Sequence, residues 1–338
     1  RALRALVKVC SDKAAPLIAL AADIRDGKVA DGDDQLLGIL LEALYPDDIT
    51  PEKIFDYLHA PQSETLIGDY VLFWIQLTKK IPETPEQVTA LIEACVARWP
   101  VILPVIKARH MQSLSGEILA CALELNGDNA SVNQLYDWLG ISIDEYSHPQ
   151  IENEHRDRVV QWLIQHPKHY KSIYEYSVER LYAKSELQSQ RHTIEARLLR
   201  TPMPDDFIEW CFEQASEDQR AEVSDFYFQT AISKRFVISE LNSGDTEMVW
   251  KRICGNERHR AIWMRWTSTP RDGYQRDSHL RNQNDSVREA TLTRDRVISF
   301  RQYLAAIEDG TAHAQLFHQL GMVYYGIYYE FTGETPEE

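Results

Sequence analysis

The sequence predicts an all-α protein, an irregular α-solenoid of stacked helix pairs of the HEAT or tetratricopeptide (TPR) type. Three observations support this fold class. Apolar residues recur at i, i+3 and i+4 in many segments, which is the spacing of one helical face. No alternating run of β-branched residues reaches five positions, and no Asn-Gly turn lies between such runs. Most of the 14 glycines and 14 prolines fall between the periodic segments.

The first clear helix is predicted from a stripe of leucines: Leu36, Leu37, Leu40, Leu41 and Leu44. A second helix is predicted to begin after Thr84, whose hydroxyl can accept a bond from a free backbone amide, with Pro85 at the first helical position. Its apolar face consists of Val88, Leu91, Ile92 and Cys95. The spacing of both stripes indicates helices with one buried face each.

Three further helices follow the same logic. Residues 113–125 form one, which is expected to end at Asn126 and Gly127. Val159, Trp162 and Leu163 mark another. The third opens after Pro204, and its apolar face contains Phe207, Trp210, Cys211 and Ala215. Over the whole chain we expect roughly 15 to 18 short helices joined by short turns. The aromatic segment around Phe317, Leu320, Gly321 and Tyr324 has the spacing of a first tetratricopeptide helix.

Two breaks in this pattern suggest a division into three parts. Residues 142–153, around His148 and Pro149, form a weak break. Residues 267–285 are rich in Arg, Asp, Asn, Gln and Ser, which indicates a long exposed loop. We therefore predict an N-terminal helical repeat region over 1–141, a second over 142–266, and an Arg-rich loop with a C-terminal helical pair over 267–338.

The charge is distributed unevenly along the chain. The net charge is −16, but residues 251–301 carry 12 Lys and Arg against 6 Asp and Glu, a local charge of +6 that leaves −22 for the rest. Residues 23–56 carry 10 acidic and 3 basic side chains. The acidic total argues against nucleic acid binding over the whole surface, because phosphates would be repelled.

Composition also bears on location. No window approaches the roughly 18 to 20 consecutive apolar residues that a membrane-spanning helix needs. Five scattered cysteines without a CxxC pair favour a reducing, cytoplasmic location: Cys10, Cys95, Cys121, Cys211 and Cys254. The chain begins at Arg1 without Met and stops at a sequence typical of a helix start, so we expect it to be a piece of a longer protein.

Motifs for common enzyme chemistry are absent from the sequence. It contains no GxxxxGK[ST], GxGxxG, HExxH or GxSxG pattern. Asp205, Asp206 and Glu209 match a DDxxE pattern that binds Mg²⁺-diphosphate in all-helical isoprenoid synthases, although the second metal motif of those enzymes is missing. The favoured interpretation is that both aspartates stabilise the start of a helix, where carboxylates accept bonds from free amides.

Two other clusters contain residue types that could form binding sites. Histidines and glutamates gather between residues 148 and 169, at positions His148, Glu152, Glu154, His155, His166 and His169. Pro167 separates the pair at i, i+3, so we expect these to be solvated residues at helix boundaries and not metal ligands. The basic segment offers Arg258, Arg260, Arg265, Arg271, Arg276 and Arg281 to a phosphate, nucleic acid or acidic partner. The alternative is that this segment faces the acidic remainder of the chain or a neighbouring domain, with Trp263 and Trp266 in the core.

Two segments resemble a known family. The first consists of residues 43–58, Pro61, residues 66–70, Phe73 and Trp74, and the second of residues 202–211 with Gln214 and Ala215. Both are similar to the helical region that follows the nucleotide-binding domain in large bacterial NACHT-type (STAND) NTPases. The likeness extends loosely over residues 1–330, but only the first segment is specific. Its residues have packing roles: Tyr45, Pro46, Pro51, Gly68, Tyr70, Phe73 and Trp74. Pro51 and Glu52 are expected to open a helix.

The resemblance implies a regulated switch in which a helical region senses a ligand or partner, often in anti-phage defence. This chain has no Walker motif, so we expect it to be non-catalytic, without a cofactor or metal of its own, and to serve as the helical scaffold or sensor. Its partner would be another protein or neighbouring domains of the same chain, with no membrane. Nucleic acid binding through residues 251–301 is the less favoured option. The alternatives are an isoprenoid-synthase-like Mg²⁺-dependent enzyme and a phosphate- or nucleic-acid-binding helical module.

Overall fold

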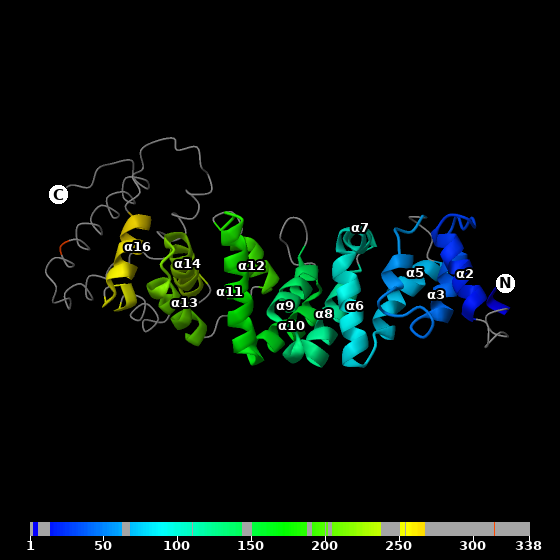
Figure 1. Cartoon of the computed structure of the whole chain (residues 1–338), viewed down its shortest axis with the longest axis horizontal. Coiled ribbons are helices and arrows are strands. Elements are labelled where there is room, and N and C mark those ends of the chain that lie inside the picture. Colours follow the sequence, from blue (N-terminus) through cyan, green and yellow to red (C-terminus); the bar gives the residue numbers. More distant parts are fainter. Residues whose placement is uncertain are drawn as a thin grey trace, which may run out of the picture. The chain divides into compact units, whose positions relative to one another are not determined.

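The structure is a computed structural model in which helices form all of the regular secondary structure that is described (Figure 1). It describes residues 3–5, 14–62, 68–109, 111–143, 151–187, 191–199, 201, 205–237, 251–253, 255–267 and 314. No strand occurs in these ranges, which confirms the all-α prediction. The solenoid arrangement and the three-part division remain predictions. The predicted loop after Thr267 and the aromatic helix near Tyr324 lie outside the described ranges.

The chain divides into two compact units. Unit 1 comprises residues 1–177 and 192–201, and unit 2 comprises residues 178–191 and 202–338. Nine described helices lie wholly in unit 1: α2 (Ala14–Arg25), α3 (Gln35–Leu44), α4 (Ile54–Tyr57), α5 (Asp69–Gln76), α6 (Pro85–Ala97), α7 (Trp99–Arg109), α8 (Gln112–Asn126), α9 (Val132–Leu139) and α10 (Asn153–Gln165). Short 3-10 turns connect some of them: η1 (Leu77–Lys80), η2 (Gly127–Asn129) and η3 (Gly140–Ser142). Helix α11 (Pro167–Ala183) crosses the division, and α12 (Arg191–Arg197) lies almost wholly in unit 1.

Helices α3 and α5 pack against each other more closely than ordinary side chains would permit. The predicted leucine stripe is confirmed at Leu37, Leu40, Leu41 and Leu44, which are buried, whereas its first member, Leu36, is half-buried. Gly38 lies on the same helix, and a Cβ atom added there would overlap the backbone of α5 at Asp69 and Tyr70. The absence of a side chain at Gly38 therefore allows the two backbones to touch.

Helices α6 and α8 form the next packed pair. The predicted cap is confirmed, because the Thr84 hydroxyl accepts a hydrogen bond from the Gln87 amide and Pro85 occupies the first turn. The predicted apolar face of α6 is buried at Val88, Leu91, Ile92 and Cys95. No single described helix is long and apolar enough to cross a bilayer; α6 and α7 reach that length and apolarity only together, across a bend of 86°.

The end of α8 differs from the expectation in one respect. The helix ends at Asn126 as predicted, but Gly127 has φ −58° and continues into η2 instead of adopting a left-handed conformation. A Cβ atom added at Gly127 would overlap the indole ring of Trp162 on α10. The glycine is thus required by a neighbouring helix and not by its own backbone dihedral angles.

The helix expected at Pro51 and Glu52 begins later. Residues 51–53 form a turn in which the Lys53 amide donates to the Thr50 carbonyl, and α4 starts at Ile54. Ile54 and Phe55 are buried and α4 packs against α6, so packing determines where the helix begins.

Unit 2 is organised around α13 (Asp205–Glu217), α14 (Ala221–Val237) and α16 (Glu257–Thr267). The predicted apolar face of α13 is buried at Phe207, Cys211 and Ala215. Helices α13 and α14 pack together, and α16 contacts both of them. Trp263 of α16 is fully buried, as the core interpretation requires, whereas the side chain of Trp266 lies outside the described part.

We predict that Gly38→Ala lowers the free energy of unfolding of unit 1 by about 1–3 kcal/mol, because the added methyl group pushes α3 away from α5. The matched control is Gly32→Ala, since a Cβ atom at position 32 would meet open space. Urea denaturation followed by far-UV circular dichroism measures both variants. Equal midpoints for the two would show that the close contact between α3 and α5 does not limit stability.

Candidate functional site

The residues of the motif that resembles the NACHT-type helical region lie at the joint between α3 and α5. Tyr45 follows the last residue of α3, and its ring packs edge-on against Phe73 of α5 at a centroid distance of 6.0 Å. Gly68 precedes α5 and lies against the side chain of Gln35, where a Cβ atom would not fit. Tyr70, Phe73 and Trp74 of α5 are buried here. Of the two prolines in the motif, Pro51 is buried in the turn before α4 and Pro46 is half-buried.

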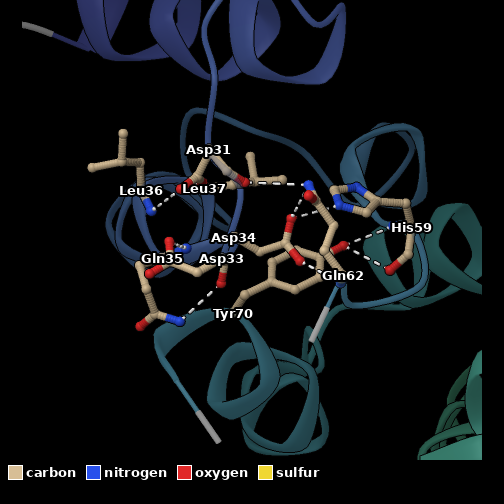
Figure 2. Close-up of polar contacts among 9 residues, drawn as sticks. All are labelled: Asp31, Asp33, Asp34, Gln35, Leu36, Leu37, His59, Gln62 and Tyr70. Carbon is tan, nitrogen blue, oxygen red and sulfur yellow. Dashed lines mark hydrogen bonds and ion pairs between the residues drawn. The ribbon is translucent and has the colours of Figure 1, made fainter. Parts of the chain in front are cut away.

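A buried carboxylate forms the centre of a polar network beside this joint (Figure 2). Asp34 is only 2 % exposed. Its carboxylate accepts hydrogen bonds from the Gln62 backbone amide at 2.7 Å and from Gln62 Nε2 at 2.9 Å. His59 Nε2 lies 2.9 Å from the same carboxylate. Asp34 thus links the start of α3 to the segment that follows α4.

Asp31 completes the connection at the start of α3. Its Oδ1 accepts a hydrogen bond from the Leu36 amide at 3.2 Å, and its Oδ2 accepts one from the Leu37 amide at 2.8 Å. The first amides of a helix have no partner within the helix, so this carboxylate satisfies two of them. The Asp31 carbonyl also accepts a hydrogen bond from Gln62 Nε2 at 3.2 Å.

Tyr70 of α5 joins the network from the other side. Its hydroxyl accepts a hydrogen bond from the His59 amide at 2.7 Å and donates one to the His59 carbonyl at 2.9 Å. The rings of the two residues stack at a centroid distance of 5.0 Å. Burial raises the pKa of the Tyr70 hydroxyl, so it stays protonated and keeps its donor.

The network has two features that occur at functional sites. Asp34 has φ 58°, a left-handed conformation that is uncommon for a residue other than glycine. The His59 side chain is 40 % exposed and is oriented by a buried carboxylate. Such a pair can exchange a proton or bind a ligand. The sequence carries no signal for this pair, because Asp31 and Asp34 stand out in it only as part of the acidic local charge.

The first part of the histidine-rich stretch forms a cluster between α8 and α10. His155 is buried, so the prediction that it is solvated was wrong; its Nδ1 lies 2.9 Å from Glu117 Oε2. Arg158 donates to both Glu117 oxygens at 3.0 Å and to Glu124. Burial by itself raises the pKa of Glu117, but the hydrogen bonds from Arg158 and Cys121 and the charge of Arg158 together outweigh it and hold that pKa below its usual value. Glu152 and Glu154 lie at the beginning of α10, and His148 is outside the described ranges.

The remaining two histidines lie on either side of the junction between α10 and α11. Helix α10 ends at Gln165 and α11 begins at Pro167, so the predicted break at this proline is confirmed. Both rings stack on Trp162. Among the described residues, no group of three or more His, Cys, Asp or Glu side chains could hold a metal ion.

The DDxxE residues lie on the first turns of α13. Asp205 and Asp206 are exposed there, and both belong to the acidic first turn of the helix. Glu209 forms an ion pair with Arg252. The third carboxylate of the pattern is therefore engaged with a cation of the basic segment.

The described part of the basic segment contacts α13. Arg258 donates a hydrogen bond from Nη1 to the Ser216 carbonyl at 3.0 Å. Arg260 is half-buried on α16, and Arg265 lies on the same helix with a side chain that is not described. Arg271, Arg276 and Arg281 lie outside the described ranges. The contacts of Arg252 with Glu209 and of Arg258 with Ser216 support the interpretation that the segment faces its own chain.

His259 is the buried centre of this contact. Its Nε2 lies 2.7 Å from Ser216 Oγ and 2.9 Å from the Phe212 carbonyl, while Nδ1 lies 3.2 Å from the Arg252 carbonyl. Burial lowers the pKa of this imidazole, and the nearby cations Arg252 and Arg258 lower it further. His259 connects α16 to α13 and was not singled out from the sequence.

Comparison with protein-family models, with curated proteins and with solved structures found no match.

We predict that Asp34→Asn lowers the free energy of unfolding of unit 1 by about 1–3 kcal/mol, because an amide group would place a donor against other donors. Asparagine tolerates the left-handed conformation, so the change isolates the carboxylate. The control is exposed Asp47→Asn, expected to change stability by less than about 0.5 kcal/mol. Urea denaturation measures both, and equal effects would show that the Asp34 network does not stabilise the unit.

We predict that α16 becomes less stably docked as the pH falls below 6.5, the usual pKa of histidine. The folded-state pKa of His259 is lowered, so the unfolded segment binds the proton first and the stabilisation is lost as the pH falls toward the folded value. Hydrogen exchange of α16 amides at several pH values, corrected for intrinsic rates, measures this. His259→Gln should remove most of the dependence, and an unchanged profile in that variant would contradict the assignment.

Proposed function

We propose that this chain is a non-catalytic helical scaffold or sensor region of a NACHT/STAND-type regulatory NTPase of bacteria. It would bind a protein or another effector, in anti-phage defence or signalling, and transmit that event through packed helices. The observation that supports this proposal best is the joint between α3 and α5. The specific part of the resembling motif lies there, and Tyr45, Tyr70, Phe73 and Trp74 act in packing.

The polar groups that are bonded within the chain also fit a scaffold better than an active site. The Asp34 carboxylate is occupied by Gln62 and His59, and Arg158 is occupied by Glu117 and Glu124. Groups already bonded within the chain hold helices in a defined relative geometry. A relay needs such joints, because a displacement at one end of a loose assembly would not reach the other.

The alternatives receive less support from the described residues. A Mg²⁺-dependent diphosphate enzyme needs three carboxylates facing one ion, and Glu209 is paired with Arg252. A nucleic-acid module needs free cations along a surface, and Arg258 donates to the Ser216 carbonyl. Both alternatives therefore rank behind the scaffold proposal.

We expect the purified chain to hydrolyse ATP and GTP no faster than buffer, because its sequence has no phosphate-binding loop. The gene sequence upstream of Arg1 should encode a Walker A motif, and a protein that includes that segment should hydrolyse nucleotide. Replacing the Walker lysine of that longer protein with Ala is the matched control for contaminating activity. Hydrolysis by the chain alone, or an upstream reading frame without a nucleotide-binding domain, would contradict the proposal.

A further inference from the structure

We draw no further inference here: the strongest candidate, the exposed apolar face of α7 formed by Pro100, Val101, Pro104 and Ala108, carries none, because nothing in the structure shows what covers it.

Discussion

The backbones of α3 and α5 are in direct contact at Gly38, and this contact determines the geometry of the joint that contains Tyr45, Tyr70 and Phe73. Because the two helices touch there, the position of Tyr70 relative to α3 is fixed. Its hydroxyl reaches both the backbone amide and the carbonyl of His59. His59 in turn lies against Asp34. A single position without a side chain thus sets the distances of a polar network that extends from α3 to the segment after α4.

The three polar joints follow one physical rule. Asp34 and His259 are buried ionisable groups and Glu117 is half-buried, and each finds its partners on another helix or loop. An ionisable group without partners would be costly in these environments, so each joint is stable only in the arrangement that satisfies it. Such joints favour one relative placement of the helices over others of similar apolar burial. A scaffold needs its helices in one relative placement. Apolar packing alone discriminates less between such placements, because apolar contacts are not directional.

The sequence predicted those features that depend on neighbours within a few positions. The stripe from Leu37 to Leu44, the cap at Thr84 and the break at Pro167 all belong to this class. The features that it did not predict depend on residues far apart in the chain. The beginning of α4 is set by packing against α6, and Gly127 is required by Trp162. The Asp34 network joins residues separated by more than twenty positions, and a single sequence carries no sign of that pairing. His155 was expected in solvent because its partner Glu117 lies on another helix.

The contact between Gly127 and Trp162 has a consequence for how the sequence can vary. A larger residue at 127 fits only if the side chain at 162 becomes smaller, so the two positions are constrained as a pair and their substitutions are not additive. The indole also supports His166 and His169, which extends the constraint to four positions on three elements. Substitutions at 127 and 162 are therefore expected to be coupled, and a change at either position has its mildest effect alongside a compensating change at the other.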